Sequence, residues 1–178
     1  MRTKIMTKTA ADTALEDAEK LWIAGTPQQA REAFRRARLL YHESGDAAGE
    51  AGALVMLGDF EAETGHIPAA REAYTDARAL EAREGNQHDQ AGILVRLGEL
   101  AHREGNTKDA LQFFASAREL YDSASDNSGL AHVAKRLGHM ERDQGRQDLA
   151  LDHYAEALSL YQRDNDTLGQ ANVLKAMG

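Results

Sequence analysis

Histidine is the residue type in this chain best suited to binding a metal or moving a proton, and the sequence holds seven. His132 and His139 stand two helical turns apart, which is too far for them to share one ion. Lys135 and Arg136 lie between them and would repel a cation. The sequence has no cysteine that could supply a thiolate. We therefore expect no metal site.

The sequence gives no indication of an enzyme. Acidic side chains are plentiful, but none stands in an apolar setting that would shift its pKa, and no motif surrounds a nucleophile. The glycines do not form a phosphate-binding loop, because they mark helix ends and helix-packing positions instead. We therefore expect no catalytic residue and no cofactor.

Charge and hydropathy exclude two further classes of partner. The 178 residues include 29 acidic and 21 basic side chains, a formal net charge of −8, which opposes binding to nucleic-acid phosphates. The apolar runs are far shorter than the roughly 20 residues that a membrane span needs. The segment from Met1 to Thr9 is basic but lacks the apolar core of a secretory signal. We interpret the chain as cytoplasmic, binding neither nucleic acid nor membrane.

Glycine, alanine and aromatic residues recur at intervals of forty along the chain, and this period determines the predicted fold. Each set of residues forty apart is called a column. The columns are Gly25, Gly65, Gly105, Gly145; Gly58, Gly98, Gly138, Gly178; Ala30, Ala70, Ala110, Ala150; Phe34, Tyr74, Phe114, Tyr154; and Ala37, Ala77, Ala117, Ala157. A fixed period of this length predicts a stack of repeats, each packed on its neighbours.

Each period contains two helices. In residues 47–86 the first helix has apolar residues at spacings of three and four and ends at Gly65. The second begins near Pro68 and ends at Gly85. No stretch alternates like a strand. The sequence therefore predicts an all-α fold of nine helices in antiparallel pairs.

These columns resemble the signature of the tetratricopeptide repeat (TPR) family over nearly the whole chain. In residues 47–86 the signature is Leu57-Gly58, then Ala70, Tyr74 and Ala77, and the next two repeats follow it. A forty-residue repeat, rather than the usual one of about 34, resembles the long-repeat branch found in spindle-orientation adaptors, kinesin light chains and bacterial signalling regulators. The resemblance implies a right-handed α-solenoid, the TPR superhelix.

The expected organisation begins with an atypical repeat. Asp17 and Ala18 stand in that repeat where the signature has Leu-Gly, which suits a capping repeat with one polar face. The expected segments are an N-terminal extension (1–10), four repeats (11–46, 47–86, 87–126 and 127–166) and the first helix of an incomplete fifth repeat (167–178).

The resemblance also implies a partner-binding groove, because the first helices line the concave face in this family. The residues expected there in the basic half are Arg96, His102, Arg103, His132, Lys135, Arg136, His139, Arg142, Asn172 and Lys175. An arginine can bind a carboxylate through two parallel hydrogen bonds, so the expected partner is a protein or peptide with acidic or carboxylate groups. The family's two-lysine, two-asparagine clamp is not expected, because Glu99 and His139 stand where asparagine is required.

The last helix predicts a second kind of contact. Its apolar residues are Leu168, Val173, Leu174 and Met177, and no second helix follows to cover them. We expect part of this stripe to pack on the region of Tyr154, Ala157 and Leu158, and the rest to support self-association.

Three functions stay open from the sequence alone. The first is a non-enzymatic scaffold that holds a partner segment in its groove. The second is a self-assembly element that stacks into a homo-oligomer through its open ends. The third is the sensor arm of a larger signalling protein truncated at residue 178.

Overall fold

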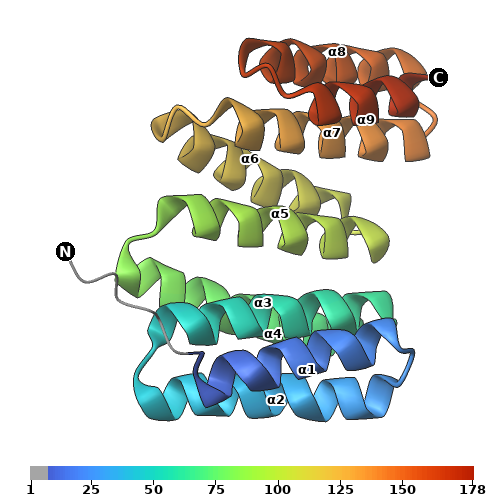
Figure 1. Ribbon diagram of the computed structural model, residues 1–178. Helices are drawn as coiled ribbons and strands as arrows, with labels where there is room; N and C mark the ends of the chain where they lie inside the picture. Colours follow the sequence, from blue (N-terminus) through green and yellow to red (C-terminus); the bar gives the residue numbers. More distant parts are fainter. Residues whose placement is uncertain (1–7) are drawn as a thin grey trace. The chain divides into compact units, whose positions relative to one another are not determined.

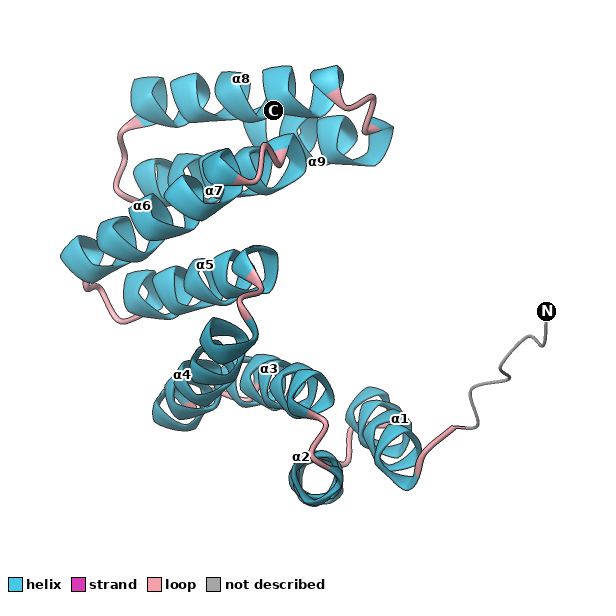
Figure 2. Cartoon of the chain, turned by 90° about the vertical axis from the view of Figure 1, so that its left-hand side faces the viewer, coloured by secondary structure: helices cyan, strands magenta, loops and turns pink. Residues whose placement is uncertain are grey.

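The computed structural model describes residues 8–178. These residues form helices joined by short loops, with no strand (Figures 1 and 2). The helices are α1 Ala10–Ile23, α2 Pro27–Ser44, α3 Ala47–Glu63, α4 Ile67–Glu84, α5 Gln87–Arg103, α6 Thr107–Ser123, α7 Asn127–Asp143, α8 Gln147–Arg163 and α9 Thr167–Met177. The predicted all-α fold of nine helices is confirmed for this part of the chain. The first seven residues of the expected N-terminal extension lie outside it.

The chain forms two compact units, Met1–Gly85 and Asn86–Gly178. In unit 1, α1 pairs with α2, α3 pairs with α4, and α2 packs on α3. In unit 2, α5 pairs with α6, α7 with α8, and α9 packs on α8, while α6 contacts α7. Each unit is therefore a stack of helical hairpins.

The caps of the first helices explain where these helices begin. Asp46, Asp126 and Asp166 each accept a hydrogen bond from the backbone N–H three residues ahead, at the start of α3, α7 and α9. Two of these caps follow a residue with a positive φ. Ser125, before Asp126, has a φ of 54°, and Asn165, before Asp166, has a φ of 56°. The turn thus reverses the chain within three residues between consecutive helices.

Glycines allow the two helices of a hairpin to approach closely. A Cβ built on Gly98 would come within 2.7 Å of the Phe114 ring, and the same relationship joins Gly58 to Tyr74 and Gly138 to Tyr154. The predicted packing role of this glycine column is therefore confirmed.

A second aromatic–glycine column joins successive hairpins, and the sequence reading missed it. Its pairs are Tyr41 with Gly49, Tyr121 with Gly129, and Tyr161 with Gly169. Each tyrosine ring lies where a Cβ on the glycine would stand. The corresponding column positions at the boundary between the two units hold Glu81 and Asp89 instead.

Buried carboxylates stabilise the stack in unit 1. Glu61 is 2% exposed and accepts two hydrogen bonds from Arg31, from Nε at 2.5 Å and from Nη2 at 2.8 Å. Glu50 accepts from Arg38 Nε at 3.3 Å. Both pairs join α2 to α3, so each ties one hairpin to the next.

Candidate functional site

Five side chains of α7 lie along one side of the helix in unit 2. They are His132, Lys135, Arg136, His139 and Arg142, and we call them the α7 stripe. Their spacing of three and four residues returns to the same side of a helix. The stripe runs for about 15 Å along the helix axis. The first four side chains are partly buried and Arg142 is exposed.

Arg136 is held in place by two neighbours. Its Nε donates a hydrogen bond to His132 Nε2 at 3.1 Å, and the same Nε is the atom that forms the ion pair with Glu99 of α5. The Glu99 pair links two first helices of unit 2. Arg136 is thus already bound to a carboxylate.

His132 is a neutral hydrogen-bond donor. Burial lowers its pKa to about 4, with Arg136, Lys135 and Arg96 contributing by charge repulsion. Because Nε2 accepts from Arg136, the ring proton sits on Nδ1. This Nδ1–H has no hydrogen-bond partner among the described residues. The ring therefore offers one N–H to a ligand at neutral pH.

His139 is held by the second helix of its own hairpin. Its Nδ1 lies 3.1 Å from the Tyr154 hydroxyl, and the two rings meet edge to face with centroids 5.5 Å apart. Burial lowers the pKa of His139, followed by the charges of Arg142, Arg136 and Lys135, while Asp143 opposes them. Both histidines of the stripe are therefore biased toward the neutral form.

Lys135 is the cation of the stripe that makes no direct ion pair, although Glu99 lies near enough to act on its pKa. Within residues 8–178 its ammonium makes neither a hydrogen bond nor an ion pair. Burial and the charge of Arg136 lower its pKa, and Glu99 acts in the opposite direction. Burial and the nearby Arg136 together destabilise the charged lysine, and Glu99 offsets them without a direct contact, so a bound anion would stabilise the ammonium further.

Arg142 is the most accessible member of the stripe, with 42% of its side chain exposed. Its closest ion pair is with the adjacent Asp143 at 3.7 Å. Asp143 in turn lies 3.1 Å from His102 Nε2 on α5. An exposed contact of this length contributes little, so Arg142 is available to a ligand.

The other predicted groove residues are less closely grouped. Arg96 extends from α5 and donates to the Gly92 carbonyl at 3.4 Å, and Arg103 is exposed at the end of α5. Asn172 and Lys175 are exposed on α9, and their side chains have no partner in the described part of the chain. The stripe on α7 is the part of the predicted set that the structure brings together most clearly.

Sequence reasoning did not assign the counter-charges of this face. Glu99 entered it as a groove-facing residue and as a misfit to the family clamp, without a cationic partner, and Asp143 was not considered. A sequence spacing could have indicated these partners, because side chains 41 residues apart contact each other between successive first helices. Trp22 donates to Glu63 at 3.1 Å in unit 1, and His102 contacts Asp143 in the same way in unit 2. Each predicted cation can therefore be checked against the residue one repeat away.

The structure changes the expected self-association surface. Val173 is fully buried in a cluster with Ala131, Ala134 and Tyr154, so it does not belong to an exposed stripe. Leu168 is 71% exposed, and Leu174 and Met177 are also accessible. The expected packing against Tyr154, Ala157 and Leu158 is confirmed for Val173.

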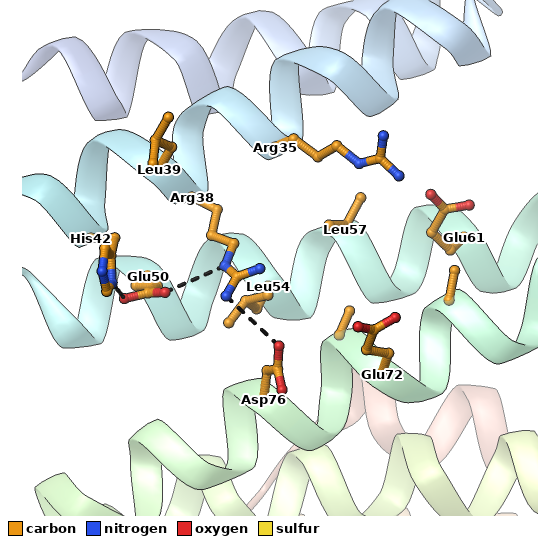
Figure 3. Close-up of a pocket in the computed structure, with 12 residues that line it drawn as sticks. Arg35, Arg38, Leu39, His42, Glu50, Leu54, Leu57, Glu61, Glu72 and Asp76 are labelled. Carbon is orange, nitrogen blue, oxygen red and sulfur yellow. Dashed lines mark hydrogen bonds and ion pairs between the residues drawn. The ribbon is translucent and has the colours of Figure 1, made fainter.

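Unit 1 contains a cleft of about 550 Å³ between α2, α3 and α4. Figure 3 shows Arg38 of α2 reaching to Glu50 of α3 and to Asp76 of α4, above Leu54. The ion pair to Asp76 is 3.7 Å long. Arg38 and His42 both contact Glu50, so this buried carboxylate of the cleft already has a counter-charge in Arg38 and a second polar partner in His42. The cleft is therefore a weaker candidate than the α7 stripe.

Two further observations concern residues 8–178. They contain no group of three or more histidine or acidic side chains placed to hold a metal ion. None of their helices combines the length and the hydropathy required to cross a membrane.

Comparisons with known proteins identify the fold. Residues 89–163 match the family model for the tetratricopeptide repeat. The crystal structure of MamA is similar with a TM-score of 0.62 at 20% identity, covering 88% of this chain and 81% of that one. No curated protein matches the sequence significantly.

Two longer proteins are also similar. BtubC (BKLC) from P. vanneervenii has a TM-score of 0.64 at 21% identity, over 93% of this chain and 63% of that one. Aspartyl phosphate phosphatase F from Bacillus subtilis has a TM-score of 0.79 at 13% identity, over 95% of this chain and 45% of that one. This chain therefore spans less than two thirds of either protein. At such identities the likeness shows the fold alone.

Proposed function

We propose that this chain, whose residues 89–163 match the tetratricopeptide repeat model, is a non-enzymatic scaffold that binds an acidic segment of a partner protein on the α7 stripe. Repeats of this kind generally serve as surfaces for protein partners, since stacked hairpins present a long face rather than one enclosed site. The fold shared with a phosphatase does not carry an activity with it, because function depends on particular side chains. The lack of cysteine is in keeping with a cytoplasmic scaffold.

The observation that supports this proposal best is the unpaired, partly buried Lys135. It lies among side chains that offer N–H donors, and Arg142 extends the cationic surface by two turns. A carboxylate would satisfy the ammonium and accept from the neighbouring N–H groups. An acidic segment therefore fits this face better than a basic or an apolar one.

Charge reversal tests the proposal. Lys135→Glu and Arg142→Glu should each weaken binding of a fluorescent acidic peptide at least about fivefold at low salt, and less at high salt, where exposed charges are screened. Arg136 is a poorer probe than the sequence suggested, because its reversal would set two carboxylates against each other at Glu99.

Matched reversals on second helices provide the control. Arg78→Glu on α4 and Lys108→Glu on α6 change the net charge equally but lie outside the stripe. Fluorescence anisotropy should show near-parental affinity for both. If they weaken binding as much as the stripe variants do, the peptide is held by the overall charge and the proposal fails.

The exposed end of α9 supports self-association as a second candidate function. Leu168 and Leu174 are 71% and 54% exposed, and such apolar side chains gain free energy when another chain covers them. Sedimentation of the full chain should show an average mass that rises with concentration. In the double variant Leu168→Asp/Leu174→Asp the mass should stay near that of the monomer. A constant monomer mass at high concentration would exclude it.

A further inference from the structure

The α7 stripe contains the same arrangement twice. His132 and Lys135 are three residues apart, and His139 and Arg142 are three residues apart. Residues at this spacing are neighbours on the surface of a helix, with Cβ atoms about 5–6 Å apart. Each pair therefore combines one imidazole with one cation, and we call the pairs the Lys135 seat and the Arg142 seat.

Arg136 separates the two seats without forming a third. Its Nε lies between His132 Nε2 and a carboxylate oxygen of Glu99, so its charge is already compensated. The bond from Arg136 also orients the His132 ring so that Nδ1 carries the free proton. The stripe thus presents two separate anion sites rather than one continuous basic surface.

The chemistry of the second seat matches that of the first. When the Tyr154 hydroxyl donates to His139 Nδ1, the ring carries its proton on Nε2 and can donate it to an anion. Arg142 supplies the charge, and its exposed contact with Asp143 at 3.7 Å is easily replaced.

We propose that the two seats recognise a partner segment that carries two acidic side chains three residues apart in an extended, polyproline-II-like conformation. The inference rests on the proposed function and specifies the partner. Equivalent residues of the seats are two helical turns apart, about 10.5 Å along the axis. In a polyproline II helix, residues i and i+3 point the same way and are about 9 Å apart.

Other spacings fit less well. In a β-strand, residues i and i+2 share a side but are only about 6.6 Å apart, and residues i and i+3 point to opposite sides. A helical ligand with acidic residues at i and i+7 would match the distance. However, a docked helix gains its affinity from an apolar face, and the α7 stripe has no apolar member.

Isomeric peptides test the spacing against the full chain. The probes have blocked ends, the same neutral flanks and the cores Glu-Pro-Pro-Glu, Glu-Pro-Glu-Pro and Pro-Glu-Glu-Pro, so they share one composition and one charge. We expect the first core to bind about two- to fivefold tighter than the other two, the difference that one lost ion pair makes. An Ala-rich helical peptide with Glu at i and i+7 should bind more weakly than the first core.

A double-mutant cycle assigns each acidic side chain to its seat. Lys135→Gln should couple to Glu→Gln at one end of the Glu-Pro-Pro-Glu core, and Arg142→Gln should couple to the other end. Lys108→Gln on α6 is the control, with unchanged affinity expected.

The outcomes separate this inference from the proposed function. Equal affinities for the three cores, all weakened by Arg142→Glu, would overturn the spacing and leave the acidic-segment scaffold standing. Tighter binding of the helical probe would overturn the extended conformation. If no acidic peptide binds, the proposed function and the spacing both fail.

Discussion

The ring of Phe114 in α6 lies against the backbone of Gly98 in α5, where a Cβ would come within 2.7 Å of the ring. Phe114 is 2% exposed and sits in the core of unit 2. Because neighbouring side chains surround the ring, it cannot move aside without disturbing them. The pair fixes how closely the two helices of the hairpin approach.

Gly98→Ala should therefore destabilise the protein. We expect the free energy of unfolding to fall by about 1–3 kcal/mol through overpacking, although alanine has the higher helix propensity by about 1 kcal/mol. Gly92→Ala in the same helix is the control, because its Cβ would make only ordinary contacts, with Tyr121 Oη at 3.6 Å and Arg96 Nη1 at 3.8 Å. Chemical denaturation should show Gly92→Ala equal to the parent or more stable. Equal stabilities for the two variants would contradict the packing described here.

Removing only one partner of the buried ion pair between Arg31 and Glu61 should strongly destabilise the protein. Arg31→Ala leaves a carboxylate that is 3% exposed with the His66 imidazole as its remaining polar neighbour in an ion-pair contact, and we expect a loss of about 3 kcal/mol. Arg118→Ala removes a more exposed pair with Glu156 and should cost less than about 1 kcal/mol. Thermal melts of the two variants measure the difference, and similar melting temperatures would argue against the burial of Glu61.

His132 should make stability fall in mild acid. Its pKa is about 4 in the folded chain and about 6.5 in an unfolded one, so the unfolded state takes up the proton first as the pH falls. The contribution is complete above about pH 6.5 and is lost progressively toward pH 4. Between pH 7 and pH 5 the loss should be about 2 kcal/mol, and His132→Gln should show a shallower decline. An NMR titration of the ring with a midpoint near 6.5 would rule this out.

Two neighbouring residues of α9 should differ sharply in their effect on stability. Val173 is fully buried, so Val173→Ala should lower the free energy of unfolding by about 1–3 kcal/mol. Leu174 is 54% exposed, and Leu174→Ala should change it by less than about 0.5 kcal/mol. Urea denaturation curves provide the measurement. If the order is reversed, α9 packs through its other side.

Much of the fold follows from local signals in the sequence. Gly65 and Gly105 take a positive φ at helix ends, and Asp126 caps the helix that follows it. These effects act within a few residues, so the period of forty and the helix positions can be predicted without knowing the packing. The column of Gly98 also showed where helices approach closely, because only a missing side chain permits it.

The charge balance of the α7 stripe was decided by tertiary packing. The sequence identified His132, Lys135, Arg136, His139 and Arg142 through the family resemblance but treated them as equivalent. Only the structure pairs Arg136 with Glu99 and leaves Lys135 without a direct ion pair.

The position of α9 on the fourth hairpin likewise decided which of its apolar residues are buried. The sequence grouped Val173 with Leu174, whereas packing buries the first and exposes the second. The physical reason is the same in both cases. Burial and electrostatic pairing depend on side chains that another helix supplies from one repeat away, and the pattern within a single helix does not specify them.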